Sequence, residues 1–385
     1  MQEALPKALL DGLSLEPRPY QVRIVAKALA MFRGEWLDRT GNRPRAAHSV
    51  LIESPTGSGK TVMGLMLARY LQQTEGLRVG WVAMRRNLLA QAGEENRRRG
   101  FDVDMELISM FDKCPPKVDL LVVDEAQHDA AMSMANLHGM IRPKVILGLS
   151  ATPYRTDRVK LCFERVIRDA DIHHLIEDGY LSPYHHYTIP DYTPEKVAEC
   201  YAREPRRWGK SLIFFHRLEQ CRQCHALLQQ RGFRGEVVTA ASNRARQIDD
   251  FAQGRIPLLF SMAILAEGFD CPSLRTVFCR PSGRSCTVQM GGRVFRQHPE
   301  LPYKQIVQCR NTRHPFPKTA AAAQQYVWSE TGWKALKLNR HLATISTNSL
   351  RVIAATQAQL PELITKNRTR RNWWERLQRR AEAVG

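Results

Sequence analysis

The stretch Ser54-Pro55-Thr56-Gly57-Ser58-Gly59-Lys60-Thr61 decides how the rest of this sequence is interpreted. An apolar run over residues 50–52 precedes it and predicts a buried strand, and an apolar helical pattern over residues 62–71 follows it. Glycines let successive backbone N–H groups turn toward an anion, and a helix N-terminus adds its positive dipole end. This context predicts a phosphate-binding loop, in which Lys60 reaches the terminal phosphates and the Thr61 hydroxyl binds Mg²⁺. A chance Gly/Ser surface loop does not account for the strand and the helix, although Ser54 stands where the general pattern has glycine.

Composition describes an ordinary globular protein with a strong excess of positive charge. The 385 residues suggest two or three domains, and 43% hydrophobic with 25% charged residues is typical of a soluble chain. A net charge of +19 favours a polyanionic partner, and nucleic acid is the usual one. No apolar run approaches the roughly 18 residues that span a membrane, and the first residues lack a signal-peptide pattern. Nine scattered cysteines indicate reduced thiols, so we expect a cytoplasmic protein with no membrane contact.

The segment Cys221-x-x-Cys224-His225 is the nearest approach to a metal motif. No second Cys-x-x-Cys pair completes a tetrahedral zinc site, so free buried or half-buried thiols are favoured and zinc is the alternative. Residues 169–210 carry four histidines loosely spaced among tyrosines and prolines, without acidic partners at metal-site spacing. We interpret that segment as a boundary between domains.

A second motif follows the apolar strand predicted over residues 118–123. It reads Asp124-Glu125-Ala126-Gln127-His128. Beside a phosphate-binding loop, the first carboxylate is expected to hold Mg²⁺ and the second to orient and deprotonate the attacking water. Helix capping accounts for either acid alone but not for this order at this place.

Other predicted strands end in polar side chains that have two interpretations each. The strand over residues 144–149 leads into Ser150 and Thr152, which suit either a simple turn or a sensor of the γ-phosphate. The strand over residues 78–83 leads to Arg85, which suits either a solvated side chain or a phosphate contact at the carboxyl edge of a parallel sheet.

Strands and helices alternate in two blocks. Over residues 50–165 they predict a doubly wound, mainly parallel sheet. Gln21 begins a helix upstream of this block, and its amide suits either a helix cap or the N6 and N7 edge of adenine. A second block has strands predicted over residues 211–215, 235–239, 257–261 and 275–279.

Two basic regions follow the second block. Residues 289–296 are predicted to open a helix with Arg293 and Arg296 on one face, which suits a phosphate or, taken alone, a solvated pair. From about residue 326 the chain is predicted to be helical and basic. There Trp373-Trp374 lies among Lys and Arg side chains, a pattern that suits nucleic-acid contact and stacking or packing on a protein.

Together these motifs resemble those of the superfamily 2 helicases and translocases. SPTGSGKT is similar to motif I, DEAQH (124–128) to motif II, SATPYR (150–155) to motif III and QMGGRVFR (289–296) to motif VI. RPYQ (18–21), MRRNLL (84–89), SLIFFH (211–216) and AEGFDCPSL (266–274) resemble the Q-motif region and motifs Ia, IV and V. The order and spacing match over roughly residues 15–310, and the last 60–75 residues resemble nothing we can name.

The resemblance implies an α/β fold of two tandem RecA-like domains, parallel sheets flanked by helices, over residues 1–180 and 181–325. A basic helical extension would occupy residues 326–385. ATP and Mg²⁺ would bind in the cleft, with Gln289, Arg293 and Arg296 reaching the γ-phosphate. The implied catalytic residues are Lys60, Asp124, Glu125, Gln289, Arg293 and Arg296. The implied ATP-binding residues are Gln21, Ser54, Pro55, Thr56, Gly57, Ser58, Gly59, Lys60, Thr61, Gly268 and Asp270, with Thr61 and Asp124 as metal ligands. Gln127, His128, Ser150 and Thr152 would couple hydrolysis to movement, and Arg85, Ser109 and Thr239 would line the nucleic-acid track.

Residues 267–274 and 280–296 look most like the DNA-directed branch, which includes restriction-enzyme motor subunits and RadD-like bacterial helicases. We therefore expect an ATP-dependent DNA helicase or translocase, encoded by a bacterium or a phage and acting on single-stranded, forked or branched DNA. Gln127 and His128 depart from a plain DEAD or DEAH ending, which leaves an RNA helicase as one alternative. A DNA-binding adaptor, whose basic tail recruits a replication or repair protein, is another.

Overall fold

A computed structural model describes residues 11–37, 41, 44–128, 132–151, 161–262, 269, 271–330 and 332–336, with the backbone alone at 128 and 132–135. Thr152, Gly268, Asp270, Trp373 and Trp374 lie outside the described residues, as does the side chain of His128. The chain divides into two compact units, residues 1–334 and 335–385. The following description concerns the first unit and the end of its last strand.

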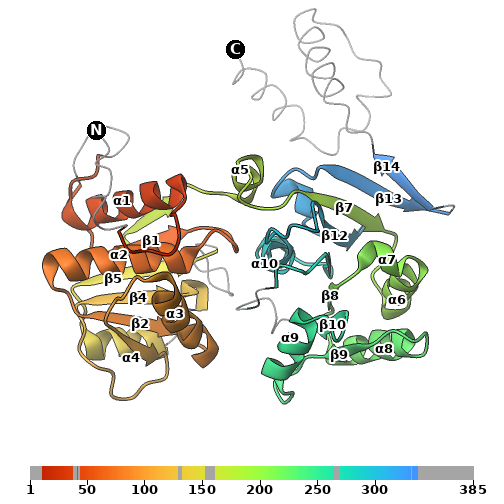
Figure 1. Ribbon diagram of the computed structural model, residues 1–385, viewed down its shortest axis with the longest axis horizontal. Helices are drawn as coiled ribbons and strands as arrows, with labels where there is room; N and C mark the ends of the chain where they lie inside the picture. The colour runs from red at the N-terminus through yellow and green to blue at the C-terminus, as the bar shows by residue number, and fades with distance from the viewer. Residues whose placement is uncertain are drawn as a thin grey trace, which may run out of the picture. The chain divides into compact units, whose positions relative to one another are not determined.

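The first sheet has six strands in the order β3-β2-β4-β5-β1-β6, and their pairings are parallel (Figure 1). The strands are β1 (Ser49–Glu53), β2 (Val79–Ala83), β3 (Met105–Ser109), β4 (Leu120–Asp124), β5 (Val145–Ser150) and β6 (Arg165–Arg168). The helices of this part are α1 (Pro19–Arg33), α2 (Lys60–Glu75), α3 (Arg86–Arg99) and α4 (Met132–Ile141), with a short 3-10 helix over Ala126–His128.

Alternation along the buried strands places helices on both faces of this sheet. Trp81 and Val122 pack into a core shared with α1, α2 and α3, whereas Val82 and Val123 pack into a second core with Leu137 of α4. A strand that is buried at every position, such as β4, is expected where both faces of a parallel sheet are covered. The carboxyl ends of all these strands therefore meet at one edge, where the polar side chains of the motifs emerge.

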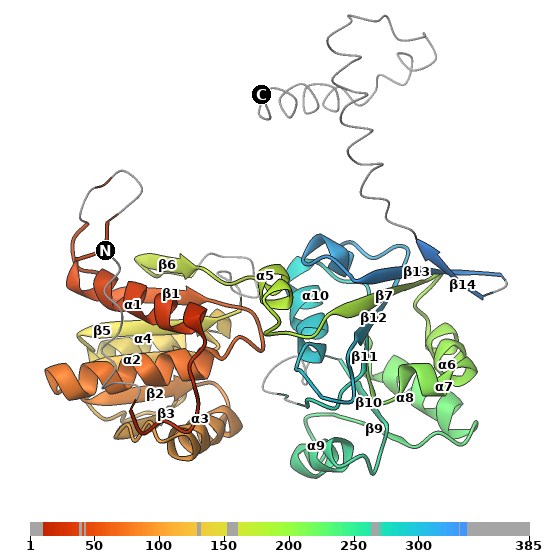
Figure 2. The same ribbon diagram turned by 45° about the horizontal axis from the view of Figure 1, so that its top comes forward.

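The second sheet has eight strands in the order β14-β13-β7-β12-β11-β8-β10-β9 (Figure 2). They are β7 (Tyr184–Ile189), β8 (Ser211–Phe214), β9 (Gly235–Val237), β10 (Leu258–Ser261), β11 (Thr276–Phe278), β12 (Lys304–Cys309), β13 (Gln324–Ser329) and β14 (Gly332–Leu336). Its helices are α5 (Ile172–Glu177), α6 (Pro194–Arg203), α7 (Pro205–Trp208), α8 (Leu218–Gln229), α9 (Arg244–Ala252) and α10 (Arg284–Gly291), with 3-10 turns at Gly292–Val294 and Phe316–Lys318. The α/β fold of two parallel, helix-flanked sheets is confirmed.

Cys221 and Cys224 lie on the inner side of α8. Both are fully buried in the apolar core that α6, α7 and α8 form on one face of the second sheet. Burial raises the pKa of the Cys221 thiol to about 11, so both behave as small apolar side chains. This placement agrees with the interpretation of the pair as free buried thiols.

Two local expectations are wrong. Residues 289–296 do not open a helix: α10 ends at Gly291, a 3-10 turn follows, and Arg296 lies beyond it. Residues 324–329 and 332–336 are strands rather than helix, because β13 pairs in parallel with β7. Tertiary pairing overrides the helical and basic character of this segment. Strands β7 and β12 were also missed, since they lie in segments interpreted as a boundary or left unassigned.

No helix in the described part of the chain is long and apolar enough to cross a membrane.

Gly64 marks a close approach between the helix after the phosphate-binding loop and the sheet. A Cβ at this position would lie 2.8 Å from Trp81 and 2.9 Å from Leu149. Helix propensity favours alanine by about 1 kcal/mol, but overpacking a core costs about 1–3 kcal/mol. We predict that Gly64→Ala lowers the free energy of unfolding in urea. Gly139→Ala in α4, where a Cβ meets nothing within 4 Å, is the control and should be neutral or stabilising. Equal effects of the two substitutions would contradict the packing argument.

Candidate active site

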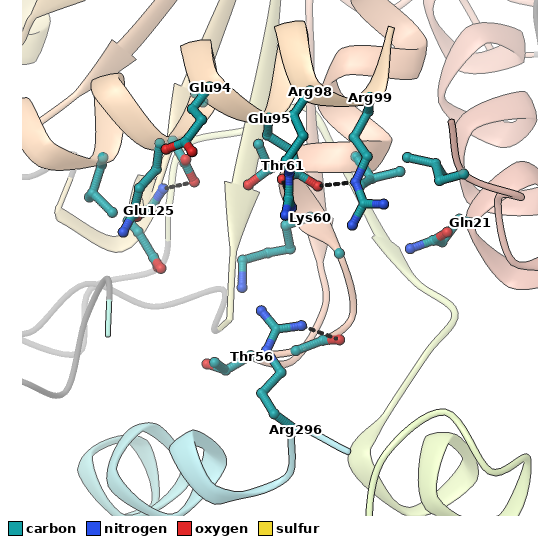
Figure 3. A pocket seen from close by; sticks show the side chains of 18 of the residues that line it. Gln21, Thr56, Lys60, Thr61, Glu94, Glu95, Arg98, Arg99, Glu125 and Arg296 are labelled. Atoms are coloured by element: carbon teal, nitrogen blue, oxygen red, sulfur yellow. Dashed lines mark hydrogen bonds and ion pairs between the residues drawn. The ribbon is translucent and has the colours of Figure 1, made fainter. Parts of the chain in front are cut away.

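A pocket of about 550 Å³ opens at the phosphate-binding loop (Figure 3). The first sheet and its helices supply most of the lining, and residues that follow β10 and α10 supply the rest. The lining residues used below are Arg18, Gln21, Thr56, Gly57, Gly59, Lys60, Thr61, Glu94, Glu95, Arg98, Arg99, Asp124, Glu125, Phe269, Arg293 and Arg296.

Hydrogen bonds from α1 fix the loop from below. The carbonyl of Ser58 accepts from the Tyr20 hydroxyl at 2.6 Å and from Gln21 Nε2 at 2.9 Å. Gly59 has φ 79° at the start of α2, and a Cβ there would lie 2.4 Å from Gln21 Nε2. Only glycine fits this position without strain. Within the loop, Ser54, Pro55 and Ser58 are buried and are not among the residues that line the pocket.

Gln21 uses half of its hydrogen-bonding capacity to hold the loop. Its Oε1 accepts from the backbone N–H of Arg18 at 2.9 Å, while Nε2 donates to Ser58. A glutamine amide has two N–H donors and two acceptor lone pairs, so one of each remains for the edge of an adenine. The cap and the adenine reader, which the sequence left as alternatives, are therefore compatible.

Lys60 is a buried amine next to two buried or half-buried carboxylates. Burial lowers its pKa, Arg293 and Arg296 lower it further, and Glu125 and Asp124 oppose the shift. A cation held with so little water interacts strongly with any anion that enters the pocket. Lys60 is thus placed to attract a phosphate.

Asp124 ends β4 inside the pocket, and Glu125 follows with φ 52°. The N–H of Glu125 donates to the Asp124 carboxylate at 2.9 Å. Burial raises the pKa of Asp124, and the like charge of Glu125 raises it further. A divalent cation would relieve this repulsion, and Thr61 lines the same pocket. The residues present therefore fit a Mg²⁺ ion.

Gln127 joins the acid pair to the end of β5. Its Nε2 donates to Glu125 Oε2 at 2.6 Å, and its Oε1 accepts from the Ser150 hydroxyl at 2.5 Å. Gln127 and Ser150 are both buried. This chain of hydrogen bonds orients the Glu125 carboxylate and links it to the end of β5.

Two arginines after α10 reach the pocket. Arg293 is buried and donates to the carbonyl of Phe269 at 3.3 Å, and Arg296 donates to the carbonyl of Gly57 at 3.3 Å. Figure 3 shows Arg296 extending toward the loop that carries Thr56. Gln289 is half-buried in α10 and is not among the lining residues.

The residues expected along a nucleic-acid track lie at the carboxyl ends of strands, outside the pocket. Ala83 and Ser109 are paired in register on β2 and β3, and Arg85 follows two residues after Ala83. Thr239 follows β9, and its N–H donates to Ser242 Oγ at 3.0 Å. All three predicted residues are partly accessible.

Sequence reasoning missed the contribution of α3 to the pocket. Glu94, Glu95, Arg98 and Arg99 extend from this helix toward the pocket in Figure 3. Glu95 accepts from Arg98 at 2.6 Å and from Arg99 at 3.1 Å, and these ion pairs lower its pKa against the effect of burial. The i,i+3 and i,i+4 spacing of these charges was the available signal.

Comparison with known proteins agrees with this geometry. A family model described as "Type III restriction enzyme, res subunit" matches residues 14–114, and the "Helicase conserved C-terminal domain" model matches residues 193–298. The chain is 23% identical to a "51.5 kDa protein" of a Lactococcus phage, over 60% of this chain and 59% of that protein. It is 22% identical to "Putative helicase 22" of a Sulfolobus islandicus filamentous virus, over 64% of this chain and 57% of that protein. The chain thus spans somewhat over half the length of these two relatives.

Two solved structures share the fold. The Type ISP restriction-modification enzyme LlaBIII, described as bound to DNA, matches 79% of this chain and 28% of its own with a TM-score of 0.59 and 14% identity. S. cerevisiae Dbp5, described as bound to RNA and ADP BeF3, matches 83% of this chain and 95% of its own with a TM-score of 0.55 and 14% identity.

The matches to both family models indicate the class of protein. They point to a superfamily 2 helicase and support ATP-hydrolysing helicase domains in this chain.

The contacts of Gln127 generate a prediction for hydrolysis. Gln127→Ala removes a hydrogen bond to the Glu125 carboxylate, an interaction worth about 1.5–3 kcal/mol. If that loss falls on the transition state, kcat for ATP hydrolysis should fall by about 10- to 150-fold with KM for ATP nearly unchanged. Steady-state hydrolysis measures both constants. A raised KM with normal kcat would show that Gln127 serves nucleotide binding instead.

Proposed function

We propose that the chain is an ATP-dependent DNA helicase or translocase that moves along DNA and unwinds or remodels it. The observation that carries the proposal is the single pocket that gathers Lys60, the pair Asp124 and Glu125, and the arginines Arg293 and Arg296. Phosphoryl transfer to water requires a cation that binds the triphosphate and carboxylates that hold a metal ion and orient a water. It also uses arginines that stabilise the transferred group, and here they come from a second structural block.

The residues have distinct roles in this proposal. Lys60 and the backbone N–H groups of the loop bind the β- and γ-phosphates, and Gln21 receives the adenine edge. Glu125 orients a water and accepts its proton as the water attacks the γ-phosphorus and the bond to the β-phosphate oxygen breaks. Mg²⁺, held by Thr61 and Asp124, would neutralise charge on the phosphate oxygens.

Arg293 and Arg296 act as arginine fingers in the proposal. Their guanidinium groups stabilise the charge that develops on the transferred phosphoryl group, a class of contact worth about 10³–10⁵ in rate. Since Arg296 follows α10 and Gly57 belongs to the loop after β1, nucleotide binding would draw these elements together. Gln127 and Ser150 would relay the loss of the γ-phosphate to the loop after β5.

Charge and family relations support nucleic acid as the partner, with DNA favoured. The net charge of +19 suits a phosphate backbone. One matched family model is that of a restriction-enzyme subunit, and LlaBIII is described as bound to DNA. Arg85, Ser109 and Thr239, at strand carboxyl ends, are proposed contacts to that backbone, in replication, recombination or repair.

Two alternatives remain as hypotheses. Dbp5 is described as bound to RNA, so the same engine could act on RNA. Alternatively the protein is a DNA-binding adaptor whose ATPase is a switch, with residues 351–385 recruiting a replication or repair protein. Deletion of residues 351–385 tests the adaptor hypothesis. If unwinding persists but a protein partner is lost, these residues act as an adaptor.

Lys60→Ala tests the role of the pocket. Without the amine, the phosphates lose their buried cation, so we predict loss of ATP hydrolysis. Binding of single-stranded DNA should survive, because Lys60 lies inside the pocket. Hydrolysis is measured by phosphate release and binding by fluorescence anisotropy. Full hydrolysis by this variant would refute the proposed mechanism.

The substrate is tested by ATP hydrolysis without nucleic acid and with single-stranded, duplex or forked DNA or RNA. We expect strong stimulation by single-stranded or forked DNA. Stimulation by RNA alone would replace DNA with RNA in the proposal, and stimulation by duplex alone would indicate a translocase. No hydrolysis under any condition would favour the adaptor.

A further inference from the structure

Exposed apolar side chains lie on or just after two neighbouring strands of the first sheet. Six large hydrophobic residues of the described chain are strongly exposed, and three of them, Met84, Leu107 and Phe111, belong to β2, β3 or the turns that follow these strands. Phe111 is the most exposed of the six, at 59%. Scattered apolar residues on a surface are ordinary, but a cluster marks a contact surface.

The turn after β3 presents Phe111 outward. The N–H of Met110 extends the sheet by donating to the Ala83 carbonyl at 3.2 Å, and the Met110 side chain is buried in the core below. A turn then closes, with the N–H of Asp112 donating to the Ser109 carbonyl at 2.9 Å. The N–H of Phe111 donates to Ser109 Oγ at 3.3 Å. These hydrogen bonds fix the backbone of the turn, so Phe111 projects from a defined position at this edge of the sheet.

Positive charge predominates next to this turn. Arg85 and Arg86 follow β2 and Lys113 follows the turn, whereas Asp112 is the acid within the turn itself. The register of β2 and β3 pairs Ala83 with Ser109, so the residues after both strands share one edge of the sheet. A protein interface also has an apolar centre and a polar rim, but a rim in which Arg85, Arg86 and Lys113 outnumber Asp112 is complementary to bases flanked by phosphates.

We propose that Phe111, with Met84 beside it on the same edge, stacks on a nucleobase of the bound strand. This inference rests on the proposed function, because it assumes that the strand crosses the carboxyl edge of the first sheet. Ser109 Oγ accepts from the Phe111 N–H and keeps its own hydrogen, which is free to donate to a neighbouring phosphate. The base contact tolerates any sequence, because every base has a π-face.

The test combines two changes, one in the protein and one in the strand. Wild-type protein and Phe111→Ala are titrated with labelled oligodeoxythymidylate and with an abasic strand of equal length. Stacking on an aromatic side chain is worth about 5- to 150-fold in affinity, so Phe111→Ala should weaken thymidylate binding by a factor in that range. On the abasic strand the two proteins should bind equally, and Phe111→Trp should restore thymidylate binding.

Two further measurements separate stacking from general effects. Phe111→Ala should leave the slope of log affinity against log salt unchanged, because no phosphate contact is lost. Tyr303→Ala is the matched control. Tyr303 is 47% exposed but lies just before β12, at the amino end of its strand, so this variant should bind thymidylate as the wild type does.

Equal affinity of wild type and Phe111→Ala for thymidylate would overturn the inference and assign the patch to a protein contact. An equal loss on both strands would overturn it too, since the ring would then act without a base. Failure of the wild-type protein to bind any strand at low salt would contradict the proposed function itself. If the wild-type protein binds DNA normally and Phe111→Ala has no effect on affinity, only this inference is contradicted and the proposed function stands.

Discussion

The site depends on Lys60, an amine buried in the pocket beside Asp124 and Glu125. Burial opposes the charge on this amine, and Asp124 and Glu125 oppose the effect of burial. The charged form of Asp124 is disfavoured as well, because burial and repulsion from Glu125 raise its pKa. A phosphate and a divalent cation would satisfy both sets of groups together. The pocket is thus preorganised for a ligand that carries its own negative charge and its own metal.

The fold provides this arrangement through parallel strands that are covered on both faces. Because all carboxyl ends of the first sheet meet at one edge, β1 delivers the loop, β4 the acid pair and β5 the serine that contacts Gln127. The position of the phosphate-binding loop depends on close packing around it. A methyl group at Gly59 would collide with Gln21, and one at Gly64 would collide with Trp81. The same edge outside the pocket presents the basic and apolar residues after β2 and β3. Nucleotide and strand would therefore be bound by the same set of strand ends.

Local patterns predicted the parts of the site that are continuous in sequence. The loop of residues 54–61 and the acids after β4 were found because strand, turn and helix signals stand next to each other in the chain. For Gln21 the structure shows the contact with Arg18 at the start of the helix, and adenine reading by the same amide stays a prediction. Sequence could not predict the contribution of α3, because Glu95 and Arg99 enter the pocket only through the packing of that helix against α2. It also misassigned β13, whose strand conformation is set by pairing with β7 well over a hundred residues away. The boundaries of the C-terminal extension, placed at residues 326–385, stay a prediction.

The central claim is that arginines after α10 complete the hydrolytic site. Single-turnover hydrolysis of ATP by Arg296→Ala, at saturating ATP and single-stranded DNA, tests it most directly. The account predicts a fall in the rate of bond cleavage by about 10³-fold or more, with ADP affinity retained, because an arginine finger acts in the transition state. Near-normal cleavage by this variant would contradict the account and would leave the hydrolytic site complete within the first sheet.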